Sequence, residues 1–169
     1  QSTRNSGVLH SGYPYRPGSK KALDCAHGNE AMRAFAAEHA IPYVQTKKLT
    51  VAVNDEQEQK LDFYLVRAEQ NLVPGVRKLN SAEIREYEPH VRAQAGMLTP
   101  TTGVIDAAGF VRTLERLAKE SGVYIMKKTE LKGVKPLEDS FELAFEEYGE
   151  KYRILSNYLI NAAGVQADE

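Results

Sequence analysis

The sequence has no tryptophan and only one cysteine, Cys25, among its 169 residues. A single cysteine cannot form a disulfide within the chain, and it cannot supply a cysteine-based zinc site. A reduced, cytoplasmic compartment is therefore expected. No apolar run approaches the roughly 18 residues that a membrane-spanning helix requires.

Neither sign of charge dominates the chain. There are 22 basic and 23 acidic residues, which leaves a net charge of −1 and no electrostatic footprint for nucleic acid. The hydrophobic content of 42% is ordinary for one globular domain with a substantial core. No cluster of His, Asp or Glu has the spacing of a metal site, so no metal is expected.

Several catalytic and nucleotide-binding motifs are absent. The sequence contains no Gly-x-Ser-x-Gly elbow, no Walker loop and no Gly-x-Gly-x-x-Gly fingerprint. Gly7 and Gly12 are too far apart to imitate the last of these. The chain by itself therefore lacks the glycine-rich loop that usually binds the pyrophosphate of a dinucleotide.

Apolar spacing and cap residues predict four helices. The dense turn residues of 1–18 indicate an ordered loop before the first helix. Expected helix starts are Ser19, Asn54 or Asp55, Ser81 and Asp106. Expected helix ends are Ala40, Leu72, the residue before Pro89 and the residue before Gly122.

Alternating patterns predict the strands. Residues 44–46 and 48–53 are expected to form a hairpin, and residues 158–160 to form a parallel strand whose end approaches a ligand. Further strands are expected at 76–79, 93–99, 123–126, 130–135, 140–145 and 151–155, the last three as an antiparallel meander. The predicted class is α+β, with a mixed, mostly antiparallel sheet, about four helices and no second domain.

The polar segment Gln1–Gly12 is the strongest candidate for a binding loop. Nearly every side chain in it can form a hydrogen bond, and its glycines let the backbone approach a bulky group. Such a loop suits a flat polar ring system, although composition alone favours an ordinary surface loop. His10 could act as acid, base or hydrogen-bond donor, or be structural.

An anionic substrate would need cationic and hydroxyl groups. Tyr13, Tyr15 and Arg16 could line such a pocket, and Arg4 could do the same. Taken singly, each is as readily explained as an exposed surface residue. Cys25 lies in a helical pattern and is interpreted as a small packed side chain rather than a nucleophile.

Three segments carry a resemblance: Arg4–Gly12 with its continuation to Ala22, Gly103–Asp106, and Ile160–Asp168. Together and in this order they resemble one family, the FAD-dependent oxidoreductases of the D-amino-acid oxidase superfamily. The most similar branch is that of the L-2-hydroxyglutarate dehydrogenases and oxidases, with glycerol-3-phosphate dehydrogenase-like proteins as neighbours. Two departures are modest: Ser11 stands where the family usually has Ala, and Val104-Ile105 reverses the usual order.

The resemblance implies a division of the chain. In this family a substrate domain is inserted between discontinuous pieces of an FAD domain. Residues 19–156 would be the substrate-binding domain, and 1–18 and 157–169 would be remnants of an FAD domain that is mostly absent. Both ends of the sequence look cut, which is the expectation for such a fragment.

The resemblance also implies roles for single residues. His10 would be catalytic, and Tyr13, Tyr15 and Arg16 would contact the substrate. The residues expected beside the FAD are Arg4, Asn5, Ser6, Gly7, Val8, Ala163 and Gly164.

The implied activity is hydride transfer from a small, anionic 2-hydroxy acid, such as L-2-hydroxyglutarate, to flavin. Glycerol 3-phosphate oxidation, amino-acid or amine oxidation, and a non-catalytic binding domain stay open as alternatives. The electron acceptor is unknown, and the full-length enzyme from which this fragment would derive could associate peripherally with a membrane. The fragment alone is expected to be colourless and inactive, and to self-associate through exposed strand edges.

Overall fold

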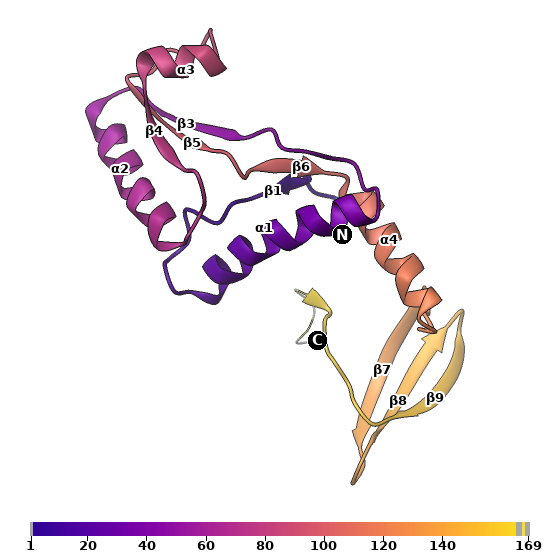
Figure 1. Cartoon of the computed structure of the whole chain (residues 1–169). Helices are drawn as coiled ribbons and strands as arrows, with labels where there is room; N and C mark the ends of the chain where they lie inside the picture. The colour runs from indigo at the N-terminus through magenta and orange to yellow at the C-terminus, as the bar shows by residue number, and fades with distance from the viewer. Residues whose placement is uncertain (1, 165–166, 168–169) are drawn as a thin grey trace. The chain divides into compact units, whose positions relative to one another are not determined.

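The computed structural model describes residues 2–164 and 167, and its fold is α+β (Figure 1). Contacts between Cα atoms divide the chain into two compact units, Gln1–Leu117 and Ala118–Glu169. The predicted fold class and the four predicted helices are confirmed. The domain pieces predicted from the sequence divide the chain differently, and they stay a prediction.

The helices begin at polar caps. Helices α1 to α4 span Lys20–Glu38, Asp55–Gln70, Ser81–Tyr87 and Ala107–Glu120. Three predicted caps accept a hydrogen bond from a backbone N–H of the first turn, Ser19 from Ala22, Asn54 from Gln57 and Asp106 from Gly109. The predicted start Ser81 is instead the first residue of α3, and Asn80 is its cap. Helix α3 has a complete capping box, in which Asn80 and Glu83 each bind the other's backbone N–H.

Three helices end in the same left-handed motif. The residue after each helix cap has a positive φ, namely Ala40, Leu72 and Gly122. The next residue donates a 2.9 Å hydrogen bond to the carbonyl five positions earlier, from Ile41 to Ala36, Val73 to Ala68 and Val123 to Ala118. Gly122 is the residue type predicted for this position, whereas the other two helices place a side chain where glycine is favoured.

The first unit contains two three-stranded antiparallel sheets. Sheet A has the order β1-β6-β2, with strands Val8–Leu9, Gly103–Ile105 and Tyr43–Val44. Sheet B has the order β3-β5-β4, with strands Lys48–Ala52, Ala95–Thr99 and Arg77–Asn80. The strands predicted at 76–79 and 93–99 are thus confirmed.

The predicted hairpin of 44–46 and 48–53 is wrong. Strand β2 pairs with β6 and strand β3 pairs with β5, so the two segments belong to different sheets. Strand β1 lies in the segment that was predicted as a loop, and strand β6 was not predicted. Both have only two or three residues, too few for an alternating pattern to show, and they exist because distant segments pair.

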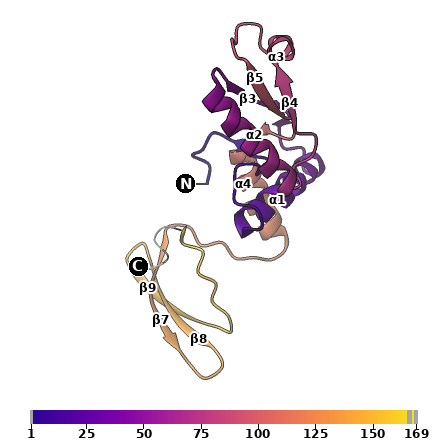
Figure 2. The same ribbon diagram turned by 90° about the vertical axis from the view of Figure 1, so that its left-hand side faces the viewer.

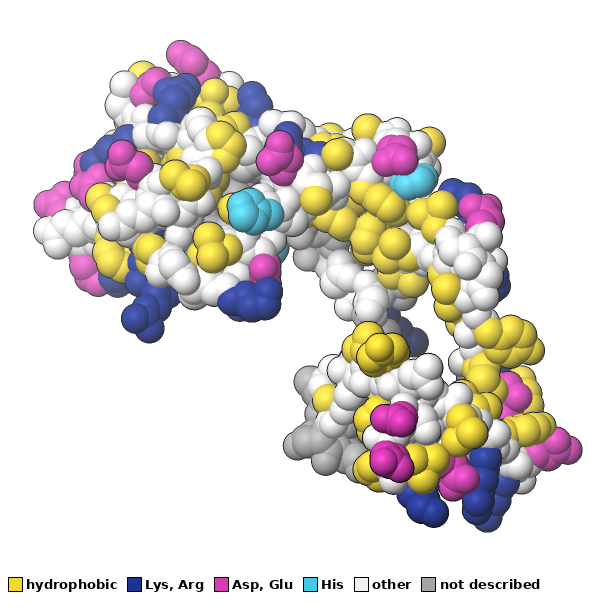
Figure 3. Space-filling view, turned by 60° about the horizontal axis from the view of Figure 1, so that its bottom comes forward, with side chains coloured by type: hydrophobic (Ala, Val, Ile, Leu, Met, Phe, Trp, Pro, Cys, Tyr) yellow, Lys and Arg dark blue, Asp and Glu magenta, His cyan; other side chains and the backbone are white. Residues whose placement is uncertain are grey.

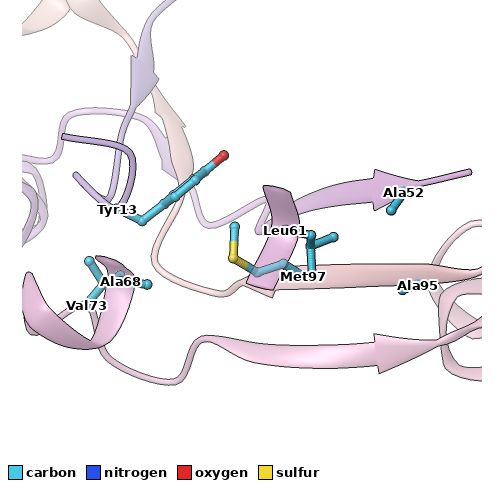
Figure 4. Close-up of a cluster of buried hydrophobic side chains, with 7 residues drawn as sticks. All are labelled: Tyr13, Ala52, Leu61, Ala68, Val73, Ala95 and Met97. Carbon is cyan, nitrogen blue, oxygen red and sulfur yellow. The ribbon is translucent and has the colours of Figure 1, made fainter. Parts of the chain in front are cut away.

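Helices cover both faces of sheet B. Helix α2 packs on one face, where Leu61 and Met97 belong to a buried cluster with Tyr13 (Figure 4). Ile84 of α3 packs on the other face against Leu79 and Leu98. Figure 2 shows α2 running beside the sheet. This arrangement follows from strand alternation, because successive residues point to opposite faces.

Sheet A is anchored by a separate cluster. Ile105 of β6 packs with Ala36 and Ile41 from the end of α1. Phe110 of α4 joins the cluster and meets Phe35 edge-on, with ring centroids 5.4 Å apart. One face of this small sheet therefore rests on the two helices.

The second unit is the predicted antiparallel meander. Its strands are β7 (Thr129–Pro136), β8 (Phe141–Glu147) and β9 (Glu150–Ser156), in the order β7-β8-β9. The strands predicted at 123–126 and 158–160 are wrong, since neither segment pairs with a strand in the described chain. An apolar run is compatible with a strand, but it requires a pairing partner to become one.

The surface is mixed in character. On the face shown in Figure 3, acidic and basic side chains are interspersed with hydrophobic ones. This agrees with the balanced composition of the sequence. Among residues 2–164 and 167, no helix is both long and apolar enough to cross a membrane.

Candidate functional site

The segment before β1 is an ordered loop. The Asn5 amide donates to Ser2 O at 2.7 Å, and its Oδ1 accepts from Gly7 N–H at 2.7 Å. Gly7 has φ 65°, and a Cβ there would lie 2.5 Å from Ile105 O. Two of the predicted cofactor residues, Asn5 and Gly7, therefore set the shape of the loop and its fit against β6.

Sheet A presents an exposed apolar face, which we call the valine face. Val8 of β1 and Val44 of β2 are both paired with Val104 of β6, so the three side chains lie side by side. Val44 is 63% exposed and Val104 is 41% exposed. The opposite face carries Tyr43 and Ile105, which pack in the core. An apolar surface of this kind suits a flat hydrophobic ring.

His10 follows β1 directly and has an exposed side chain on an anchored backbone. Its carbonyl accepts a 3.0 Å hydrogen bond from the Asn29 amide and a 3.5 Å hydrogen bond from the Cys25 thiol. The same Asn29 amide donates to Thr101 O at 3.0 Å, which joins this loop to the segment before β6. Burial raises the pKa of the Cys25 thiol, which favours the protonated, donating form over a nucleophilic thiolate.

Two residues of the α2 region hold the loop after this histidine. The buried Asn71 amide donates to the carbonyls of Gly12 and Tyr15 at 3.1 and 3.0 Å. Arg67 donates to Pro14 O at 2.9 Å. Carbonyls of an irregular segment thus find side-chain donors where no strand pairs with them.

Sequence reasoning missed both asparagines. Asn29 is 4% exposed inside a helix and Asn71 is 8% exposed at a helix end. A buried polar residue among helical apolar positions is a signal, because such groups are retained only when they are hydrogen-bonded. The sequence alone does not reveal the carbonyls that these amides meet 19 to 72 positions away.

Tyr13 lies mainly in the core. It is 7% exposed and meets Tyr64 edge-on in the cluster under sheet B. Its hydroxyl lies 3.3 Å from Thr50 Oγ1 and accepts a 3.3 Å hydrogen bond from Lys48 Nζ. Lys48 was not among the predicted site residues.

The other predicted substrate residues lie nearer the surface. Tyr15 is half-buried, with the Lys21 ammonium 4.5 Å from its ring centroid. Arg4 and Arg16 are exposed. Arg16 contributes its carbonyl to the start of α1, where the Ser19 hydroxyl donates to it at 2.6 Å. Ser6 is exposed as well.

The two predicted cofactor residues near the end of the chain lie in the second unit. Ala163 N–H donates to Asn161 Oδ1 at 3.1 Å, and Gly164 has φ 68°. Both are exposed. Other residues of the resembling segment, Val165, Gln166 and Asp168, lie outside the described residues.

Metal ligands do not gather in the described part of the chain. Within residues 2–164 and 167 there is no group of three or more His, Cys, Asp or Glu side chains that could hold a metal ion.

The sequence matches the model of a known protein family. The model of the family described as "DAO: FAD dependent oxidoreductase" matches residues 1–169. The L-2-hydroxyglutarate dehydrogenase of Indibacter alkaliphilus is 32% identical over 170 residues, which cover 100% of this chain and 41% of that protein. The human mitochondrial L-2-hydroxyglutarate dehydrogenase is 29% identical over 178 residues, covering 99% of this chain and 38% of that protein.

Solved structures share the fold at lower identity. The L-α-glycerophosphate oxidase of Mycoplasma pneumoniae, reduced by dithionite and with FAD bound, superposes with a TM-score of 0.77 at 23% identity. The match covers 84% of this chain and 38% of that one. The chain thus spans about two fifths of the length of the proteins it matches.

Proposed function

Because the chain belongs to the DAO family of FAD-dependent oxidoreductases, we propose that it is part of an enzyme that oxidises a small 2-hydroxy acid by hydride transfer to flavin. The observation that carries this proposal is the pairing of β1 with β6, which forms an exposed apolar face on the strand that joins the polar loop to His10. L-2-Hydroxyglutarate is the proposed substrate, because curated relatives matched over the whole chain bear that name.

The residues of sheet A fit a flavin. In this proposal the ring lies on the valine face, and burial of Val8, Val44 and Val104 contributes about 25 cal/mol for each Å² removed from water. Arg4, Ser6 and the loop backbone offer hydrogen-bond donors at the edge of the ring. FAD, when bound, supplies a hydride acceptor at flavin N5. Ala163 and Gly164 stay proposed neighbours of the cofactor on the resemblance alone.

His10 is the proposed proton acceptor. Oxidation of a 2-hydroxy acid to a 2-keto acid removes a hydride from carbon and a proton from the hydroxyl oxygen. In this proposal the exposed imidazole takes that proton, while Asn29 and the Cys25 thiol hold its backbone still.

A cation must also hold the substrate carboxylate. Arg4 and Arg16 are the proposed cations because both are exposed near the ends of the loop that carries His10. Tyr15 is a proposed neighbour of the substrate. Tyr13, whose hydroxyl meets Lys48, would act from the edge of the core.

Turnover of the full-length protein tests the activity. The substrates are L-2-hydroxyglutarate, glycerol 3-phosphate and glycine, each with a dye as electron acceptor. We expect L-2-hydroxyglutarate to be oxidised with the highest kcat/KM. Preference for glycine would instead favour amine oxidation, and turnover of none of the three would favour a non-catalytic domain.

The variant His10→Ala tests the proton acceptor. We expect kcat to fall by about 10² to 10⁴, the usual contribution of general base catalysis. His90→Ala is the matched control, because His90 is also exposed but lies after α3, away from sheet A. A His10→Ala rate equal to that of the control would show that His10 has no such role.

A further inference from the structure

A cavity with both polar and apolar lining residues lies between α1 and the loop after α2. It encloses about 240 Å³, and its lining includes Ser11, Asn29, Arg33, Asn71 and Thr101. None of the lining residues belongs to a strand of sheet A. The cavity is therefore separate from the valine face and from the proposed flavin position.

Unsatisfied polar atoms concentrate at this cavity. Six buried side-chain polar atoms of the described residues lack a hydrogen-bond partner, and four of them belong to residues of this lining. Leaving such an atom unpaired costs about 1–3 kcal/mol, and native proteins keep few of them. The four atoms are Ser11 Oγ, Arg33 Nε, Asn71 Oδ1 and Thr101 Oγ1.

The unpaired groups define the chemistry of a ligand. Arg33 is half-buried, and its Nε has no hydrogen-bond partner. A guanidinium stays charged and matches the geometry of a carboxylate. The Ser11 and Thr101 hydroxyls can donate to the same anion, whereas Asn71 Oδ1 can only accept. A complementary ligand thus carries an anion and a hydrogen-bond donor.

The rest of the lining agrees with a small, partly apolar molecule. Glu30 lies at an exposed position one turn before Arg33, where it could meet a cationic donor. Leu23, Val73 and Pro74 supply apolar wall. The volume equals that of roughly eight waters in the liquid. A carboxylate as small as glycolate or glycine fits within it.

We propose that this cavity binds a small carboxylate whose neighbouring carbon carries a hydroxyl or an ammonium group. Its carboxylate meets Arg33 with the hydroxyls of Ser11 and Thr101, and its donor meets Asn71 Oδ1. Two of the lining residues, Asn29 and Asn71, also hold the carbonyls of His10, Gly12 and Tyr15. An occupant therefore stabilises the loop that carries His10.

Calorimetric titration of the full-length protein tests the site, with glycolate, glycine, acetate and inorganic phosphate as probes. We expect glycolate or glycine to bind at least about tenfold more tightly than acetate, which lacks the donor. Tighter binding of glycolate identifies a hydroxy acid, and tighter binding of glycine identifies an amino acid. Equal binding of acetate, preferred binding of phosphate, or no binding of any probe would overturn the proposal.

Two variants assign the binding to this cavity. Arg33→Gln is expected to weaken the preferred probe about tenfold and to leave turnover on L-2-hydroxyglutarate in place, whereas the exposed-residue control Arg92→Gln changes neither. Thr101→Val, which keeps the shape, is expected to weaken binding several-fold without lowering the melting temperature. Unchanged affinity in both variants would place the probe elsewhere and reject this site, whatever the turnover of the enzyme.

Discussion

At the scale of single residues, buried amides shape the site more than the residues that face solvent. Asn29 and Asn71 together donate to the carbonyls of His10, Gly12 and Tyr15. An exposed histidine keeps a fixed position only if its backbone does. These two asparagines therefore act on the proposed chemistry through the loop, without any need to touch the substrate.

Asn71→Ala should lower the free energy of unfolding by about 2–3 kcal/mol. The substitution leaves buried carbonyls without donors, and each unmade hydrogen bond is costly. The adjacent, exposed amide in Gln70→Ala is the control and should change stability by less than about 0.5 kcal/mol. Urea denaturation measures both, and equal effects of the two substitutions would contradict the anchoring role of Asn71.

At the scale of helices and strands, local sequence signals predicted where the helices begin. They did not predict which strands pair with each other. Ser19, Asn54 and Asp106 are caps because each bonds only three positions ahead. The partner of β2 lies about 60 residues away in β6, and no local pattern encodes that choice. The same limit explains why β1, which forms the edge of the valine face, was predicted as loop.

The candidate site was likewise predictable only in its local parts. The resemblance drew attention to Asn5, Gly7, Val8 and His10 as a contiguous segment. It did not reveal that Val44 and Val104 complete an apolar face with Val8, because strand pairing assembles that face.

Ala40→Gly should raise the free energy of unfolding by about 0.5 kcal/mol. Ala40 has φ 53°, where a side chain costs about 1 kcal/mol, and the greater freedom of glycine in the unfolded chain offsets part of the gain. Ala37→Gly, an exposed position inside α1, is the control and should lower stability by roughly 0.5–1 kcal/mol. Thermal melting compares the two, and destabilisation by both would refute the argument from φ.

Val104→Lys should weaken FAD binding by the full-length protein at least about tenfold. A lysine at the centre of the valine face would have to be desolvated or displaced when a ring packs there. Val66→Lys, on the exposed surface of α2, is the control. The ratio of flavin to protein absorbance after dialysis measures the effect. If the Val104→Lys protein keeps its full flavin content, the flavin ring does not lie on the valine face.

At the scale of the whole molecule, the chain contains the valine face that we propose for the flavin ring, but it lacks the glycine-rich motif that usually binds the flavin's phosphates. No Gly-x-Gly-x-x-Gly segment occurs in the 169 residues. We therefore expect the 169-residue chain, expressed by itself, to purify without a flavin absorption band. A yellow preparation with stoichiometric FAD would show that the phosphates are held by a motif within these residues.

The most direct test is to mix the full-length, FAD-loaded protein with L-2-hydroxyglutarate under anaerobic conditions. Without any electron acceptor, the flavin absorbance then reports the proposed hydride transfer alone. We predict that the oxidised flavin band bleaches in a single turnover, and that His10→Ala slows this bleaching by about 10² or more while His90→Ala does not. Dithionite is the control, because it reduces any flavin that is able to accept electrons. If dithionite bleaches the flavin band and L-2-hydroxyglutarate does not, the proposed activity is contradicted.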